Sequence, residues 1–417
     1  MSKLIINGGA RLEGTVKIDG AKNAALAIIA AAIMAEGETI LENVPRINDV
    51  VVMTEILEFL GARINWLGRD CLSISVPDSI DYVAAYHQVK RIRASNLLLG
   101  SLVARKKITE IALPGGCQIG SRPMDLHIKG LEKLGCKVTL KNGFIKAECP
   151  RMIGSRIYLD FPSVGATENI MMAASVAEGS TILENVAKEP EIVDMANFLN
   201  AMGAKIRGAG TDVIRIDGVK SLHGIRYGII PDRIEAGTIM VGAAITRGNV
   251  VIENVIPTHL KPVVAKLQEA GVHIEESDCA IRVIGSEKIR PVDIKTLPYP
   301  GFPTDMQSQM MALLTLAEGT SVIVENIFEN RLQVASELRR MGAKIKIEGR
   351  TAVVIGVPKL LGTIVKAPDL RGGAGLILAA LAAEGKTEVH NLGIIDRGYI
   401  NIEEKFRHLG ADVIRMD

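Results

Sequence analysis

A single cysteine stands among glycines in the segment "LPGGCQIGSRP", which runs from Leu113 to Pro123. Arg122 follows Cys117 by five residues, and a guanidinium that reaches a thiol lowers the pKa of that thiol. Glycines allow unusual backbone angles and mobility. The segment could therefore hold a reactive thiol, or Cys117 could be a small apolar residue in a glycine loop.

Basic side chains stand where apolar helices are expected to begin. Six predicted helices are apolar along their length but start with polar phrases, which read "GAKNAA", "RIRASN", "FPSVGATEN", "PDRIEAGT", "FPTDMQSQ" and "PDLRGGAG". Serine and aspartate at such positions are ordinary helix caps. Lys22, Arg93 and Arg371 are not explained in this way, because the helix dipole disfavours cations in a first turn. Several helix starts that converge with these cations would form an anion-binding pocket.

The elements that position these residues recur along the chain. A phrase such as "LGA" occurs six times at intervals of 74, 68, 68, 71 and 68 residues, with its glycine at Gly61, Gly135, Gly203, Gly271, Gly342 and Gly410. A period of this kind indicates one supersecondary unit used six times. In each unit an apolar helix ends near an "AEG"-like turn and a strand follows, and then a second helix ends at the "LGA" glycine before another strand. Helices that alternate with short strands predict an α/β fold.

The repeat separates Cys117 from the other cysteines. Cys136 fills a position that holds alanine or valine in the other units, which predicts a small core residue. In the second unit Lys107 replaces the glycine of the "AEG" turn, and it precedes Gly135 by 28 residues where the other units have 23 to 25. The cysteine segment lies in this extra length, and a loop lengthened in one repeat of six is a candidate for function. Three cysteines with no outstanding basic or histidine neighbour are interpreted as structural or incidental: Cys71, Cys149 and Cys279.

Composition narrows the classes of partner. A chain of 417 residues allows two or more domains with large cores. It carries 49 basic and 47 acidic side chains without a basic block, which predicts no nucleic-acid partner. The longest apolar run, Ala24–Ala35, is too short to cross a bilayer, and the start "MSKLIINGG" does not read as a signal peptide. We therefore expect a cytoplasmic protein with no membrane partner, no metal and no cofactor; its oligomeric state stays open.

The chain resembles the enolpyruvyl transferase family, and within it the enzymes that act on UDP-N-acetylglucosamine. The phrases that carry the resemblance span essentially the whole chain and read "GAKNAAL", "RASN", "LPGGCQIGSRPMDLH", "DFPSVGATEN", "EPEIVD", "PDRIEAGT", "FPTDMQ", "FENR", "DLR" and "DRGY". The implied fold is an inside-out α/β barrel with two similar domains, each of three βαβαββ-like units around buried helices. The implied domains are residues 22–230, with the cysteine loop, and residues 1–21 with 231–417, and the active site is expected in the cleft between them.

The resemblance also implies a reaction. The enolpyruvyl group of phosphoenolpyruvate moves to the 3-hydroxyl of UDP-N-acetylglucosamine and phosphate leaves, in the first committed step of bacterial peptidoglycan synthesis. The methylene carbon of the enol gains a proton while the hydroxyl adds to the neighbouring carbon, and a proton is lost again as phosphate departs. Such a site needs an acid, a base and cations that match the carboxylate and phosphate of the substrate.

The resemblance assigns these tasks to individual residues. It makes Cys117 the general acid, which can also form a covalent phospholactoyl adduct, and Asp305 the base at the sugar hydroxyl; Lys22 and Arg397 complete the catalytic set. The residues matched to phosphoenolpyruvate and its anionic groups are Lys22, Asn23, Arg122, Arg331, Arg371 and Arg397. Those matched to the sugar nucleotide are Arg93, the run Arg122, Pro123, Met124, Asp125 and Leu126, the helix start Ser163, Val164 and Gly165, and Ile327.

The chain departs from the family pattern at two places, and two other functions stay open. Phe161 and Pro162 stand where many members carry a lysine, and "LQVASEL" follows Arg331 where members usually carry a methionine–histidine pair. One alternative is a transferase of the same fold with another acceptor, such as that of the shikimate enzyme. The other is a protein that only binds UDP-N-acetylglucosamine, which the joint presence of acid, base and cations disfavours.

Overall fold

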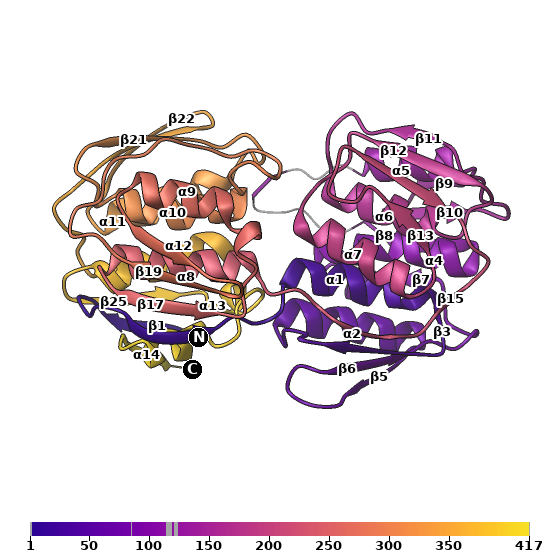
Figure 1. Cartoon of the computed structure of the whole chain (residues 1–417), viewed down its shortest axis with the longest axis horizontal. Helices are drawn as coiled ribbons and strands as arrows, with labels where there is room; N and C mark the ends of the chain where they lie inside the picture. Colours follow the sequence, from indigo (N-terminus) through magenta and orange to yellow (C-terminus); the bar gives the residue numbers. More distant parts are fainter. Residues whose placement is uncertain (1, 85, 114–118, 121–123, 417) are drawn as a thin grey trace. The chain divides into compact units, whose positions relative to one another are not determined.

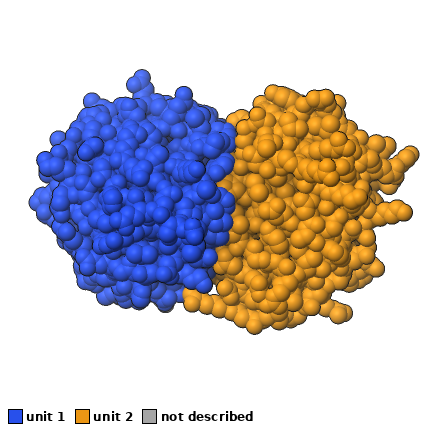
Figure 2. Space-filling view, in the orientation of Figure 1, with its two compact units in different colours: residues 1–19, 117–121, 231–417 blue, residues 20–116, 122–230 orange. Residues whose placement is uncertain are grey.

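The chain forms two compact units in a computed structural model that describes residues 2–84, 86–113, 119–120 and 124–416 (Figure 2). Unit 1 consists of the described residues of 1–19 and 231–417, together with Ile119 and Gly120. Unit 2 consists of the described residues of 20–116 and 122–230. Among the described residues, no helix is both long enough and apolar enough to cross a membrane.

Unit 2 contains three four-stranded sheets of one topology. Each sheet begins with a parallel pair of strands and continues with two antiparallel strands. A two-stranded parallel sheet adds β15 (Leu222–His223) beside β3 (Ala35–Glu36). The three sheets, in spatial order, are β16 (Arg226–Gly228), β4 (Glu38–Glu42), β6 (Leu72–Ser75) and β5 (Arg63–Trp66); β7 (Val83–Ala84), β8 (Ile108–Ala112), β10 (Phe144–Glu148) and β9 (Lys137–Lys141); and β11 (Arg156–Tyr158), β12 (Ser180–Glu184), β14 (Val213–Asp217) and β13 (Lys205–Arg207).

Unit 1 repeats the same topology in three further sheets. The N-terminal strands complete two of them, because β2 pairs with β17 in parallel and β1 lies between β25 and β26. The sheets are β2 (Glu13–Lys17), β17 (Asn249–Glu253), β19 (Ala280–Ile284) and β18 (His273–Glu276); β20 (Ile294–Lys295), β21 (Thr320–Val324), β23 (Thr351–Ile355) and β22 (Lys344–Glu348); and β24 (Ile364–Lys366), β25 (Lys386–His390), β1 (Lys3–Asn7) and β26 (Asp412–Met416).

Six nearly fully buried helices form the interiors of the units, with three in each unit, and the sheets of each unit lie outside its helices (Figure 1). These central helices are α1 (Lys22–Ala31), α4 (Leu98–Lys106) and α6 (Val164–Ala174) in unit 2, and α8 (Arg233–Ile245), α10 (Gln307–Leu314) and α12 (Leu370–Ala382) in unit 1. Their apolar residues extend around the whole helix, as expected for burial on all sides. One amphipathic outer helix joins each pair of strands: α2 (Asn48–Leu60), α5 (Asp125–Lys133), α7 (Pro190–Ala201), α9 (Lys261–Glu269), α11 (Val334–Arg340) and α14 (Ile402–His408).

Short helical turns complete the described chain, and two of them directly precede central helices. They are η1 (Ala32–Met34), α3 (Tyr86–Val89), η2 (Arg93–Leu97), η3 (Pro257–His259), η4 (Thr304–Met306), η5 (Arg331–Gln333) and α13 (Leu392–Ile395). Aspartate and serine cap three central helices, as the sequence predicts. Asp369 accepts hydrogen bonds from the N–H groups of Arg371 and Gly372. Asp232 accepts hydrogen bonds from two backbone N–H groups in the first turn of α8, and Ser163 accepts one in the first turn of α6.

Turns of the same conformation recur in the six sequence repeats. Each "LGA" glycine has a positive φ, between 91° and 107°, at the end of an outer helix, where a side chain would be strained. Lys107, predicted to replace the glycine of the "AEG" turn, has φ 61°. In the fourth repeat Arg247 takes this conformation with φ 55°, one residue before the glycine that the sequence phrase suggests. The α/β fold of repeated units around buried helices is confirmed, whereas domain boundaries at residues 22 and 230 stay a prediction.

The structure places the cysteines as follows. Cys136 is buried, which confirms that it is a small core residue, and Cys149 is buried opposite it at the open end of the β9–β10 pair. Cys71 is half-buried and Cys279 is exposed. Cys117, Arg122 and Pro123 lie outside the described residues.

Candidate active site

The candidate base and two of the predicted arginines meet in unit 1. Asp305 lies in η4, just before the central helix α10. Arg331 begins η5, and Arg371 is the second residue of the central helix α12. Arg331 Nη2 lies 2.8 Å from Asp305 Oδ1, and Arg371 donates to Asp305 Oδ2 from Nε at 3.1 Å and from Nη2 at 2.9 Å. The structure therefore brings three of the predicted site residues into direct contact, and their roles stay a prediction.

The two arginines control the ionisation of Asp305. Both guanidiniums are buried, whereas the Asp305 side chain keeps 26% of its surface exposed. Burial alone would raise the pKa of the carboxyl group, but the two positive charges outweigh that effect and hold the pKa well below its usual range. Asp305 is therefore a carboxylate that can accept a proton, but a weak base while both arginines contact it.

A buried carboxylate orders the backbone beside this cluster. Glu325 accepts a hydrogen bond from Thr304 Oγ1 at 2.9 Å through one oxygen. Its other oxygen accepts from the N–H groups of Ile327 and Phe328, at 2.8 Å and 3.1 Å. Thr304 Oγ1 in turn accepts a hydrogen bond from Arg331 at 3.0 Å. Glu325 thus fixes both the turn at Ile327, which the sequence assigns to the sugar nucleotide, and the residue before Asp305.

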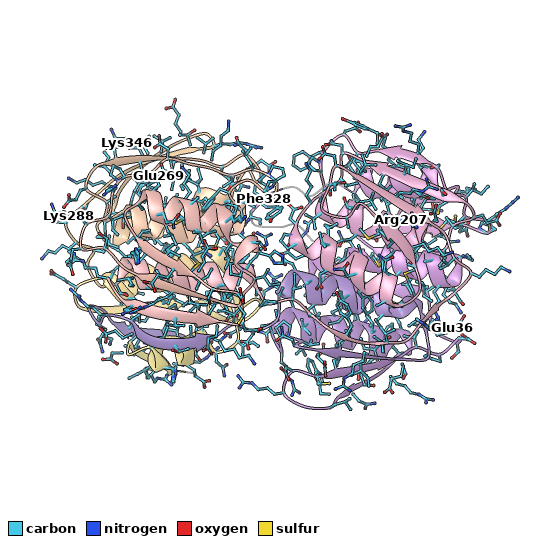
Figure 3. The ribbon with its side chains drawn as sticks, viewed as in Figure 1. Glu36, Arg207, Glu269, Lys288, Phe328 and Lys346 are labelled. Atoms are coloured by element: carbon cyan, nitrogen blue, oxygen red, sulfur yellow. The ribbon has the colours of Figure 1, made fainter. Side chains whose placement is uncertain are left out.

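Each of the two guanidiniums also contacts an aromatic ring. The guanidinium carbon of Arg331 lies 5.3 Å from the ring centre of Phe328, and that of Arg371 lies 5.4 Å from the ring centre of Tyr399. Such contacts stabilise a cation that has lost water. Phe328 follows β21 in unit 1 (Figure 3). Arg397 is half-buried in the turn between α13 and Tyr399.

Two described residues that follow Cys117 are held by unit 1. Asn330 N–H donates a hydrogen bond to the carbonyl of Ile119 at 3.0 Å. Gly120 has φ 149°, and a Cβ atom there would lie 2.1 Å from Glu329 Oε2. The positive φ favours glycine here, and any larger residue would also push the Glu329 carboxylate aside. The turn that follows Ile327 therefore fixes the chain two residues beyond Cys117.

A second set of predicted residues lies in unit 2. Lys22 begins α1, and its Nζ lies 2.7 Å from Asp49 Oδ2 in the first turn of α2, with both side chains buried. Asn23, the next residue of α1, is exposed. A lysine at this helix start was predicted for anion binding, and the structure adds its burial and a carboxylate partner. The contact with Asp49 also gives Lys22 a structural role, so the two roles must be separated by experiment.

The start of α5 and the turn η2 lie together in unit 2. Asn96 Nδ2 in η2 lies 3.6 Å from the sulfur of Met124, which directly precedes α5. Arg93 begins η2 and is half-buried, and it is close enough to affect the ionisation of His127 in α5. Asp125 is exposed in the first turn of α5, and Leu126 is half-buried. The described residues around Met124, which the resemblance assigns to the sugar nucleotide, therefore occupy one region with Arg93.

His127 joins this region, although sequence reasoning did not select it as a site residue. Gly100 N–H donates to Asn169 Oδ1 at 2.6 Å, which leaves Asn169 Nδ2 to donate to His127 Nδ1 at 2.9 Å. The ring hydrogen of His127 is therefore on Nε2. Burial is the largest effect on the pKa of His127 and lowers it. The charge of Asp125 opposes this effect and that of Arg93 adds a smaller lowering, so the pKa is about 4. The ring is neutral at physiological pH.

The predicted diphosphate-binding turn lies against this imidazole. Ser163, Val164 and Gly165 form the start of α6 and are half-buried. A Cβ atom on Gly165 would lie 3.1 Å from His127 Cε1, so the ring packs against the first turn of the helix. Free N–H groups at a helix start suit phosphate oxygens. The histidine is the last residue of the phrase "PMDLH", but only the fold shows that its ring reaches α6.

Among the described residues, no group of three or more His, Cys, Asp or Glu could hold a metal ion.

Comparison with known proteins identifies the family. A family model described as EPSP synthase (3-phosphoshikimate 1-carboxyvinyltransferase) matches residues 6–406. The chain belongs to this family of enolpyruvyl transferases. The resemblance found in the sequence is thereby confirmed.

Curated relatives and solved structures agree with the family assignment. UDP-N-acetylglucosamine 1-carboxyvinyltransferase 1 of Caldanaerobacter subterraneus subsp. tengcongensis is 56% identical over 99% of both chains. UDP-N-acetylglucosamine 1-carboxyvinyltransferase 2 of Carboxydothermus hydrogenoformans is 55% identical over all of both chains. The enolpyruvyl transferase NikO of Streptomyces tendae is 28% identical, with a TM-score of 0.89, over 99% of this chain and 98% of NikO. An EPSP synthase of Acinetobacter baumannii has a TM-score of 0.78 at 20% identity over all of both chains, which is a likeness of fold alone.

Proposed function

We propose that this protein transfers the enolpyruvyl group of phosphoenolpyruvate to the 3-hydroxyl of UDP-N-acetylglucosamine, with release of phosphate. The observation that carries the proposal is the identity of 54% to 56%, over at least 99% of this chain, with relatives named for that activity. The arginine pair at Asp305 supports it, because two buried guanidiniums that converge on one carboxylate suit the carboxylate of the donor substrate. The reaction would be the first committed step of peptidoglycan synthesis, in the cytoplasm.

The acid and the base act on different atoms. Asp305 takes the proton of the 3-hydroxyl as the oxygen uses its electron pair to bond to the central carbon of phosphoenolpyruvate. Cys117 gives a proton to the methylene carbon, which receives it with the π electrons of the double bond. The tetrahedral adduct then loses a proton from its new methyl group to the Cys117 thiolate, and the double bond forms again. Phosphate leaves with the electron pair of its bond to carbon and takes up the proton held by Asp305.

The cations stabilise the donor and its leaving group. Arg331 and Arg371 bind the carboxylate of phosphoenolpyruvate. The groups assigned to the phosphate and the remaining anionic contacts are Lys22, Asn23, Arg122 and Arg397. Fixed positive charge beside a departing phosphate lowers the barrier because it needs no rearrangement when the charge develops.

The sugar nucleotide is assigned to the residues gathered in unit 2 and to one turn of unit 1. The start of α6 binds the diphosphate, and the neutral His127 beside it can donate a hydrogen bond through Nε2. The other assigned residues are Arg93, Arg122, Pro123, Met124, Asp125, Leu126, Ser163, Val164, Gly165 and Ile327. Glu325 does not contact substrate in this arrangement and acts by positioning the Ile327 turn.

Phosphate release with alternative acceptors tests the proposed function. The purified protein and phosphoenolpyruvate are expected to release phosphate with UDP-N-acetylglucosamine and not with 3-phosphoshikimate, the acceptor named in the matching family description. Mass spectrometry of the product should show the added enolpyruvyl group on the sugar nucleotide. Release with 3-phosphoshikimate alone would favour the other acceptor, and release with neither would favour a binding protein.

Cys117 can be tested separately from turnover. The epoxide phosphonate fosfomycin is expected to add once to the parent protein, through the Cys117 thiolate, and not to a Cys117→Ser variant. Intact-mass measurement detects the addition, and Cys279→Ser is the matched control because Cys279 is exposed and its replacement should leave labelling unchanged. Labelling at another cysteine, or no labelling of the parent protein, would overturn the assignment of Cys117.

A further inference from the structure

Two buried guanidiniums share one carboxylate in unit 1. Arg331 contacts Oδ1 of Asp305, and Arg371 contacts Oδ2 through two nitrogens. Each oxygen of Asp305 is thus covered by a different arginine. The arginine side chains are each only 3% exposed, whereas the Asp305 side chain is 26% exposed. The carboxylate is therefore the accessible member of the cluster, and the cations lie behind it.

The hydrogen-bonding capacity of the arginines is not filled by Asp305. Within the part of the chain that the structure describes, Arg331 Nε and Arg371 Nη1 are buried and have no hydrogen-bond partner. Asp232 acts on the charge of Arg371 from farther away, while its Oδ1 accepts hydrogen bonds from the first turn of α8. Buried guanidinium N–H groups without partners are costly. Asp305 therefore leaves one N–H donor of each guanidinium unused.

We propose that Asp305 occupies the carboxylate site of the two arginines while no substrate is bound, and that the carboxylate of phosphoenolpyruvate displaces it. This inference rests on the proposed function and adds that Asp305 competes with the donor substrate. The two ligands have the same chemistry, because both are carboxylates whose two oxygens can each accept hydrogen bonds from a different guanidinium. Asp305 can leave by rotation of one half-buried side chain, whereas the arginines stay buried.

The displacement would control when Asp305 acts as a base. While both arginines contact it, they hold the pKa of Asp305 well below its usual range. When the arginines pair with a bound carboxylate, they stabilise the charge of Asp305 less, and the ligand adds a negative charge beside it. Both changes raise the pKa of the aspartate. A higher pKa makes Asp305 a better acceptor for the hydroxyl proton. The base thus becomes effective only after the donor substrate has bound.

The test measures binding of phosphoenolpyruvate in the absence of any acceptor. Asp305→Asn keeps the shape of the side chain and removes the charge that opposes substrate binding. We expect this variant to bind phosphoenolpyruvate at least about tenfold more tightly than the parent protein by titration calorimetry, because a competing charge-assisted contact has been weakened. The same variant should lose turnover, because the amide cannot accept the hydroxyl proton.

A matched control and a second variant make the result specific. Glu287 is a carboxylate that also lies between two arginines, Arg11 at 2.6 Å and Arg247 at 3.2 Å, but at the exposed surface of unit 1. Glu287→Gln should leave the dissociation constant of phosphoenolpyruvate unchanged. If Asp305→Asn does not fold, Asp305→Ser removes the same charge from a smaller side chain and serves for the same measurement.

The outcomes separate this inference from the proposed function. Equal or weaker binding by folded Asp305 variants would overturn the competition and show that Asp305 orients the arginines for substrate. Tighter binding would support it whichever acceptor the enzyme uses, because no acceptor is present. Failure of the parent protein to release phosphate with UDP-N-acetylglucosamine would overturn the proposed function and leave the binding comparison intact.

Discussion

Replacement of Arg371 by alanine is expected to lower kcat/KM for phosphoenolpyruvate by at least about thousandfold, because removal of one partner from a buried charge pair costs several kcal/mol. Arg371 donates twice to Asp305 and is buried at the start of α12. In the proposed reaction it binds the substrate carboxylate with Arg331. Alanine removes that contact and also one of the two charges that keep Asp305 ionised.

Two further variants show whether geometry or charge carries the effect. Arg371→Lys keeps the charge but cannot make a bidentate contact, so most of the loss should persist. Arg340→Ala removes an arginine of the same unit that is exposed and donates to the carbonyl of Ile364, and it should change kcat/KM by less than about threefold, as is usual for surface substitutions. Initial rates of phosphate release measure all three.

The outcome at Arg371 can contradict the assignment clearly. A folded Arg371→Ala variant with parental kcat/KM would exclude the arginine from substrate binding. A raised KM with unchanged kcat would mean that Arg371 binds substrate and transition state equally. A thermal unfolding curve is needed beside the kinetics, because Asp305 and Tyr399 both lose a contact in the variant.

The repeated unit could be predicted from the sequence because its signals are local. The glycine phrases mark helix ends wherever they occur, and Lys107 could be placed in a turn by counting residues. The strands that complete a sheet from far along the chain could not be found by counting. β16 joins β4 across nearly the whole of unit 2, and β1 inserts between β25 and β26. These pairings depend on closure of each unit, which no single segment encodes.

The candidate site was predictable in its residue types and much less in its contacts. Cations at helix starts were visible as exceptions to the rule for first turns. Their partners were not, because Asp305 and Arg371 are 66 residues apart and meet only when two central helices pack together. His127 and Glu325 were missed for a related reason. Each acts through groups on another element, Asn169 for the histidine and Thr304 for the glutamate.

Lys22 is expected to be essential for turnover and also important for stability, and the two effects can be separated. Lys22→Ala removes a buried ammonium 2.7 Å from the buried carboxylate of Asp49. Loss of one partner from such a pair costs about 3–5 kcal/mol, which corresponds to a fall of about 6–20 °C in Tm for a unit of this size. Phosphate release should fall by at least about a thousandfold, because the proposed contact with the substrate phosphate is lost as well.

The double variant Lys22→Met with Asp49→Leu distinguishes the structural role from the functional one. It removes both charges, and replacement of a buried ion pair by apolar side chains of similar volume is often neutral or stabilising. We therefore expect Tm to recover most of its loss while phosphate release stays at the level of the single variant. The control is Lys146→Met, which breaks an exposed pair with Glu148 of 2.6 Å in the same unit and should alter neither quantity, since exposed pairs contribute little.

The two measurements lead to opposite conclusions about α1. If the double variant recovers both Tm and turnover, Lys22 serves only to neutralise Asp49, and the polar start of α1 is a packing feature. If Tm recovers alone, the ammonium is needed at the substrate even though the fold no longer needs it. In that case the carboxylate of Asp49 stabilises a buried cation at a helix start, where the helix dipole alone would disfavour that cation.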